Sequence, residues 1–240
     1  MFKVNRDNVA PVLAEFLGTA VLVMVALILG QTTAVSYFIA TSLGVTAVVV
    51  YMLFSMVSGA HTNPAVTFGM WTARQIGTLK AIAYIAAQLL GGIASWQLFQ
   101  YLTHHTLTAK STTFSTPVFV AEMVGAALVA MAFTAALNKK FDSLYSGLTV
   151  GAAYFGGIII AATASAGYIN PAVALGSRAW SSAYILGPLL GGLVGVNLYH
   201  YVFNKADIRS AVAATSSAKS TSSKGVVVKR TTVRKKKASK

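Results

Sequence analysis

The sequence predicts an all-α membrane protein with six transmembrane helices and two half-helices, arranged as an inverted repeat of three plus three spans. Three observations support this fold class. The chain is 55% hydrophobic and only 10% charged, with a mean hydropathy of +0.66, whereas a soluble domain carries about 25% charged residues. Six apolar runs approach the roughly 20 residues that span a bilayer. Two motifs also recur at one fixed offset.

The repeat is visible in the paired motifs. An Ala-Glu-x-x-Gly pattern begins at Ala14 and again at Ala121, and an Asn-Pro-Ala-Val begins at Asn63 and again at Asn170. The differences 121 − 14 and 170 − 63 both equal 107. Two motifs in register over half the chain indicate an internal repeat.

The first repeat covers about residues 9–102 and the second about residues 117–203. The membrane spans are expected at about 9–29, 36–57 and 79–102 in the first repeat, and at about 117–137, 144–164 and 181–203 in the second. Each half also has an apolar segment too short to span, at 64–72 and 171–179. Because three spans per repeat is an odd number, the second half is inverted relative to the first.

The two short segments each start with Asn-Pro-Ala, which predicts a helix start. Asn is a strong N-cap residue, and Pro is favoured at the first helical position, where its missing N–H costs nothing. These residues are Asn63, Pro64, Ala65 and Asn170, Pro171, Ala172. Irregular backbone at membrane depth is tolerated only where protein shields it or water fills a cavity. We therefore expect two half-helices that enter from opposite faces and meet near the midplane.

Such a meeting point is expected to act as a selectivity element. Each helix N-terminus carries roughly half a positive charge, which opposes cations and protons. We expect each capping Asn to keep its amide group as a donor facing the lumen. The preceding carbonyls would form a ladder of acceptors at Gly59, Ala60, His61, Thr62 and at Ala166, Gly167, Tyr168, Ile169.

Charge distribution predicts the orientation. The net charge is +14, but 11 of the 19 Lys and Arg residues lie within 204–240. This segment is expected to be a disordered, basic, cytoplasmic tail that associates with anionic lipid and not with nucleic acid. Residues 1–203 form the predicted channel domain. The positive-inside rule places both termini in the cytoplasm and predicts a multi-pass protein of the cell membrane.

Several function classes are excluded on residue content. The chain has no cysteine, so disulfides and thiolate metal sites are ruled out. Neither Asn-Pro-Ala segment offers a nucleophile, an acid–base pair or a metal cluster. The sequence therefore predicts no enzyme activity, no cofactor and no metal.

At these motifs the chain resembles the major intrinsic protein family, the aquaporins and glycerol facilitators. Residues 58–67, Ser-Gly-Ala-His-Thr-Asn-Pro-Ala-Val-Thr, closely match the family's first signature, and the resemblance covers about residues 9–203. It implies an aquaporin-like pore in each protomer of a homotetramer. It also implies that the buried Glu15 and Glu122 hold the two carbonyl-ladder loops by hydrogen bonds.

The sequence departs from the family pattern at the outer constriction. The family carries an arginine directly after the second Asn-Pro-Ala, where this chain has Val173. Family spacing assigns the whole selectivity filter to Leu43, Ile158, Gly167 and Val173, which contain no charge and no side-chain donor. Arg178 lies five positions further along the expected half-helix, turned about 140° from Val173, and we expect it to face the outer vestibule or lipid headgroups.

Two function hypotheses from different classes remain open. The first is a passive channel for water and small neutral solutes such as glycerol, urea and ammonia, which the intact Asn63 and Asn170 favour. The second is a non-conducting scaffold or adhesion protein with the same fold, which the apolar filter favours because a hydrophobic constriction can exclude water. A coupled transporter is disfavoured, since no charged pair is expected at the midplane.

Overall fold

A computed structural model describes residues 6–110, 113–139 and 141–204, and the regular elements in these ranges are all helical. The helices are α1 (Arg6–Thr32), α2 (Ser36–Ser58), α3 (Pro64–Thr72), α4 (Thr78–Thr103), α5 (Thr116–Asn138), α6 (Ser143–Ala161), α7 (Pro171–Gly176) and α8 (Ser182–Leu198), and a short π-helix (Tyr199–Phe203) extends α8. The predicted fold class is confirmed. The basic tail lies outside the described residues, apart from Asn204.

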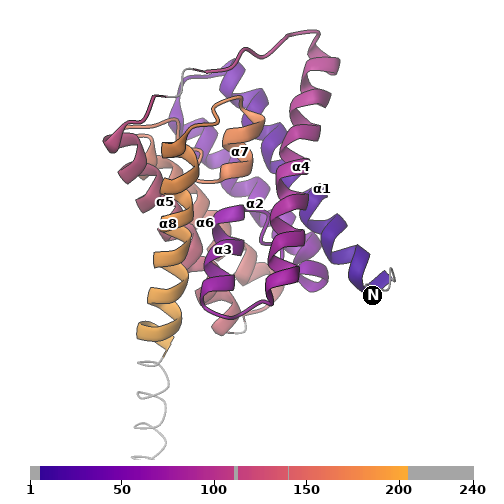
Figure 1. Cartoon of the computed structure of the whole chain (residues 1–240), viewed down its shortest axis with the longest axis vertical. Helices are drawn as coiled ribbons and strands as arrows, with labels where there is room; N and C mark the ends of the chain where they lie inside the picture. Colours follow the sequence, from indigo (N-terminus) through magenta and orange to yellow (C-terminus); the bar gives the residue numbers. More distant parts are fainter. Residues whose placement is uncertain (1–5, 111–112, 140, 205–240) are drawn as a thin grey trace, which may run out of the picture.

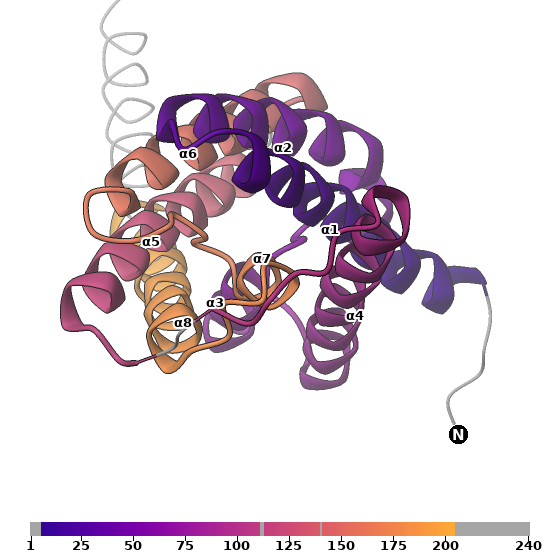
Figure 2. The ribbon, with the colours of Figure 1, turned by 90° about the horizontal axis from the view of Figure 1, so that it is seen from above.

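The short helices α3 and α7 lie between the long helices α4 and α8 (Figure 1 and Figure 2). Figure 1 shows α7 above α3, with α1 beginning at the lower end of the molecule. We use "lower end" and "upper end" in the sense of this view. Helix α3 packs against α8 and α4, whereas α7 packs against α4, α1 and α8.

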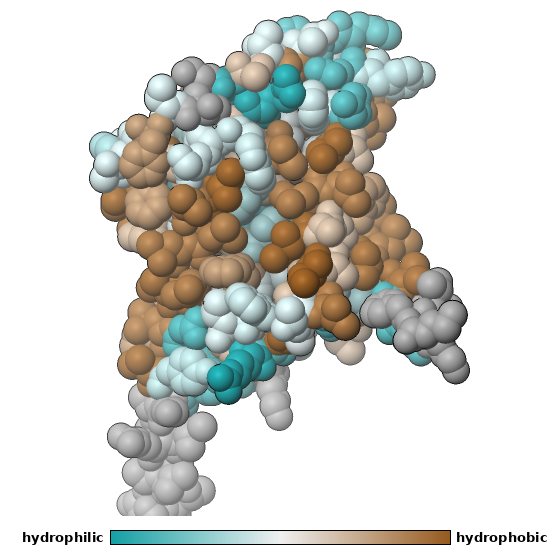
Figure 3. All heavy atoms as spheres, viewed as in Figure 1, coloured by the Kyte–Doolittle hydropathy of each residue, from teal (hydrophilic) through white to brown (hydrophobic). Residues whose placement is uncertain are grey.

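Within the described residues, six helices are long and apolar enough to cross a membrane. Figure 3 shows that the face in view carries an apolar band between two polar ends. Large apolar side chains of the long helices are exposed, including Leu53 of α2 and Leu90 of α4. A soluble monomer rarely exposes such a wide apolar surface. The chain is therefore a multi-pass integral membrane protein.

Helix boundaries agree with the predicted ones to within three residues, and the largest differences have local causes. Helix α6 ends at Ala161, where an end at about 164 is predicted. Ser165 closes the turn, since its N–H and its hydroxyl both donate to the Ala161 carbonyl, at 3.0 and 2.8 Å. The second half-helix ends at Gly176, three residues before its predicted end.

Both half-helices end in the same way. Arg74 and Arg178 each adopt a left-handed conformation, with φ of 58° and 59°. The following N–H groups bond back to carbonyls five residues earlier, from Gln75 to Met70 and from Ala179 to Ala174. This is the hydrogen bond of a Schellman motif. The prediction that Arg178 continues the half-helix is therefore wrong. The angle of about 140° between Arg178 and Val173 assumed a continuous helix and does not apply.

Candidate functional site: the junction of the two half-helices

The two half-helices begin with identical caps. The Asn63 side-chain oxygen accepts from the Ala65 N–H at 2.8 Å, and the Asn170 oxygen accepts from the Ala172 N–H at 2.9 Å. A proline follows each Asn at the first helical position. The sequence Asn-Pro-Ala therefore produces the helix start by itself, because cap acceptor and fixed proline φ are both local properties.

The amide groups of the two caps tie the halves together. Asn63 Nδ2 donates to the Ile169 carbonyl at 3.1 Å, and Asn170 Nδ2 donates to the Thr62 carbonyl at 3.0 Å. Each Asn thus binds the residue that precedes the other Asn. One of the two donors of each amide group is thus used between the halves, and one carbonyl of each predicted ladder, at Ile169 and Thr62, accepts it.

Glu15 and Glu122 hold the two loops that lead to the caps. Glu15 accepts from the Ser58 hydroxyl at 2.6 Å and from the backbone N–H groups of His61 and Thr62 at 2.9 and 2.6 Å. Glu122 accepts in the same way from Ser165 Oγ at 2.7 Å, from Tyr168 N at 2.9 Å and from Ile169 N. Each donor to Glu122 lies 107 positions after the matching donor to Glu15, as 165 − 58, 168 − 61 and 169 − 62 show.

These carboxyl groups compensate for backbone strain. Ala60 and Thr62 have φ of 53° and 45°, and the matching Gly167 and Ile169 have φ of 68° and 45°. A left-handed conformation is unusual for β-branched residues, and strained residues of this kind cost about 1–3 kcal/mol each. Hydrogen bonds to a buried carboxyl group stabilise the loops in this conformation. The strain is thus built into the approach to each Asn.

The first-half loop has extra support that the second half lacks. Gln88 Nε2 donates to Glu15 at 2.7 Å and to Thr67 Oγ1 at 2.8 Å, and the His61 ring contacts the same Thr67 hydroxyl at 3.1 Å. His61 lies between α2 and α3, outside the six long helices.

The predicted filter residues lie together at the upper end. Leu43, Gly167 and Val173 line one cavity of about 230 Å³. Ile158 is 1% exposed and packs beside this cavity, since a Cβ added to Gly167 would lie 3.1 Å from Ile158 Cγ2. A side chain larger than hydrogen at position 167 would therefore press on Ile158.

Two polar residues that the filter prediction missed also reach this region. Lys110 lines the upper cavity, and its Nζ donates to the Tyr168 hydroxyl at 2.7 Å. Tyr154 on α6 lies deeper, where its hydroxyl accepts from Asn63 Nδ2 at 3.4 Å. A sequence signal existed only for Tyr154, which lies four residues before Ile158 and hence on the same helix face.

Arg178 does not line the upper cavity. Its guanidinium lies over the Trp96 ring at 4.2 Å, a cation–π contact with α4. Its carbonyl accepts from the Lys110 N–H at 2.8 Å. The expectation that Arg178 faces the vestibule or lipid headgroups is therefore wrong for its guanidinium, which stacks on α4, whereas its backbone anchors the loop that carries Lys110.

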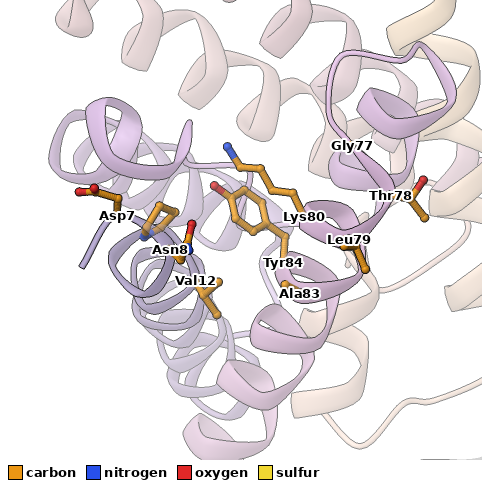
Figure 4. A pocket seen from close by; sticks show the side chains of 10 residues that line it. Asp7, Asn8, Val12, Gly77, Thr78, Leu79, Lys80, Ala83 and Tyr84 are labelled. Carbon is orange, nitrogen blue, oxygen red and sulfur yellow. The ribbon is translucent and has the colours of Figure 1, made fainter. Parts of the chain in front are cut away.

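A second cavity, of about 540 Å³, lies at the lower end between the starts of α1 and α4. Figure 4 shows Lys80 and Tyr84 of α4 on one side and Asp7 and Asn8 of α1 on the other. None of its ten lining residues belongs to α3 or α7. Tyr84 links this cavity to the site, because its hydroxyl donates to the Ser58 carbonyl at 2.8 Å.

Comparison with solved structures supports the fold. The X-ray structure of the aquaglyceroporin from Plasmodium falciparum matches with a TM-score of 0.68 and 22% identity, covering 82% of this chain and 97% of that one. At this identity the likeness concerns the fold alone.

Curated relatives include a probable aquaporin TIP-type of Medicago truncatula, 31% identical over 159 residues, and aquaporin TIP2-3 of Zea mays, 34% identical over 161 residues. Each match covers 61% of this chain and 64% of the relative. The neurogenic protein big brain of Drosophila melanogaster is 32% identical over 167 residues, covering 63% of this chain and 23% of the relative. The chain thus spans less than two thirds of the length of these relatives. The model of the major intrinsic protein family matches residues 4–200, and the chain belongs to this family.

Proposed function

We propose that the protein is a passive transmembrane channel for water and small neutral solutes, including glycerol, urea and ammonia. The observation that carries this proposal is the junction of two capped half-helices, in which Asn63 and Asn170 bind each other's preceding carbonyls at 3.1 and 3.0 Å. Irregular backbone is tolerated at membrane depth where it lines a water-filled cavity, and here buried carboxyl groups hold it in place. The relatives whose names contain "aquaporin" support the same function.

The proposed selectivity has two parts. The paired helix N-termini oppose cations and protons at the midplane. At the upper end, Leu43, Ile158, Gly167 and Val173 form an apolar constriction without the family's arginine. None of these four side chains is as long as an arginine, so we expect the constriction to admit solutes larger than water.

The proposal extends to the whole protein. Both termini would lie in the cytoplasm, which places the lower end inside the cell and the upper cavity outside. The protomer would assemble as a homotetramer in the cell membrane. The segment 204–240 would associate with anionic lipid through its 11 Lys and Arg residues.

Stopped-flow light scattering on proteoliposomes tests the channel directly. Osmotic gradients of sucrose report water permeability, and gradients of glycerol and urea report solute permeability. We expect both to exceed those of protein-free vesicles. Water permeability equal to that of empty vesicles, with no solute flux, would refute the channel.

The filter assignment has its own test. Val173→Arg adds a long cation at the apolar constriction, so glycerol flux is expected to fall about tenfold while the protein stays folded. Gly77→Arg is the matched control, because a Cβ there meets nothing within 4 Å and the residue lies at the lower end. Unchanged glycerol flux in Val173→Arg would show that the filter is misplaced.

The non-conducting scaffold is the second candidate. One observation favours it, namely that Asn63 and Asn170 are both 0% exposed, so solvent does not reach them in this structure. The same proteoliposome measurement separates the two functions.

A further inference from the structure

A tyrosine lies at the junction of the two half-helices. Tyr154 on α6 is 4% exposed, and its hydroxyl accepts from Asn63 Nδ2 at 3.4 Å. The phenol of the second repeat therefore contacts the capping residue of the first.

The Tyr154 hydroxyl takes up a donor of Asn63 Nδ2 that a permeating oxygen would otherwise use. A donor at Asn63 is useful to a channel only if a passing water or solute hydroxyl can reach it. Both Asn residues are 0% exposed, although Thr62 and His61 in the adjoining loop retain 3% and 5% exposure. The phenol and the half-helix caps thus cover the two polar groups that would orient a solute.

The contact between Tyr154 and Asn63 is weak. A donor–acceptor distance of 3.4 Å exceeds the usual 2.7–3.2 Å range for N–H···O bonds. The other Asn63 bond, to the Ile169 carbonyl, is shorter at 3.1 Å. A water molecule can therefore replace the phenol at Asn63 without breaking the bonds that hold the half-helices together.

We propose that Tyr154 sets the rate of permeation, because a water molecule or solute must displace its phenol from Asn63 to pass the midplane. The inference deepens the proposed channel function and rests on it. It differs from the apolar filter, which lies about one helical turn away on α6, around Ile158. The filter limits solute size, whereas Tyr154 limits the frequency of passage.

The test compares two substitutions with one control in proteoliposomes of equal protein content. Tyr154→Phe removes only the hydroxyl and is expected to raise water permeability about twofold, the rate equivalent of one weak hydrogen bond. Tyr154→Val also removes the ring and is expected to raise it about fivefold or more. Tyr145→Phe is the control, since Tyr145 lies on the same helix and is 63% exposed.

The temperature dependence separates displacement from a structural effect. If the phenol must move for each passage, the activation energy of water flow falls in Tyr154→Val relative to the unmodified chain. Circular dichroism and gel filtration confirm that each variant is folded. If Tyr154→Val does not fold, Tyr154→Phe and its activation energy decide.

Each outcome is decisive. Flow through Tyr154→Val with none through the unmodified chain supports the tyrosine closure and refutes a constitutive channel. Flow through the unmodified chain that both substitutions leave unchanged or lower refutes the closure and keeps the channel. No flow through any variant refutes both.

Discussion

At the scale of single residues, Lys110 changes the electrostatics of the upper cavity. The four filter residues carry no charge, yet the Lys110 ammonium reaches the same cavity and binds the Tyr168 hydroxyl. Its backbone is anchored too, since its N–H donates to the Arg178 carbonyl. A cation held at the mouth raises the local potential and disfavours cationic solutes before they meet the midplane.

A cysteine reporter can measure this potential, because the chain has no native cysteine. Gly30 lines the same cavity, and a Cβ there meets nothing within 4 Å. We expect Gly30→Cys to react faster with an anionic than with a cationic thiosulfonate. Adding Lys110→Met should lower this rate ratio about 25-fold, since a unit charge about 4 Å away in water changes the rate of each probe about fivefold in opposite directions.

Two further variants complete the measurement. Lys110→Arg keeps the charge and should keep the ratio, and Lys80→Met at the lower end should leave it unchanged. The effect of Lys110 should also shrink in about 1 M salt, where the Debye length is only about 3 Å. A ratio that Lys110→Met does not alter would show that the lysine does not control the cavity.

At the scale of elements, each half-helix is held by the long helix that ends the opposite repeat. A Cβ added to Gly192 of α8 would lie 2.0 Å from the Ala65 carbonyl of α3, and one added to Gly92 of α4 would lie 2.6 Å from the Ala172 carbonyl of α7. Backbones can approach this closely only where glycine leaves room. The two repeats are thus interlocked through crossed contacts.

Gly192→Ala should therefore destabilise the protein. The backbone carbonyl of Ala65 cannot move without shifting the Asn63 cap, so we expect a loss of about 2–3 kcal/mol, at the upper end of the usual overpacking cost. Thermal unfolding in detergent measures it. Gly30→Ala is the control, because its Cβ enters open space. Equal melting temperatures for the two variants would contradict the interlocked packing.

At the scale of the whole molecule, the two ends differ even though the inverted repeat places matching residues at both. Each half-helix is followed by an arginine in a left-handed conformation, Arg74 at the lower end and Arg178 at the upper end. Only Arg178 stacks on an aromatic ring of a neighbouring helix, at Trp96. Arg74 is exposed, and in the proposed orientation it would count as a cytoplasmic charge under the positive-inside rule.

The proposed orientation predicts which end is labelled in intact cells. Thr108→Cys at the upper end should react with a membrane-impermeant maleimide added outside. Gly77→Cys at the lower end should react only after lysis, and both sites are exposed. Labelling of Gly77→Cys alone in intact cells would reverse the orientation.

Much of the fold was predictable because its determinants are local or periodic. Span length follows from apolar runs, and the caps at Asn63 and Asn170 follow from residue type and the next proline. The offset of 107 then predicts the second half from the first. It also places the partners of Glu122 from those of Glu15.

The sequence by itself determined the helices and the repeat, since these depend on composition and spacing along the chain; the four filter residues stay a prediction from the family resemblance. Only the tertiary structure decided what faces the lumen. It brought together residues that are far apart in the sequence. Tyr154 contacts Asn63 across 91 positions, Lys110 contacts Tyr168 at the upper cavity across 58 positions, and Arg178 contacts Trp96 across 82 positions. Such contacts depend on helix rotation and on where a half-helix ends, and a three-residue difference at Gly176 was enough to redirect Arg178.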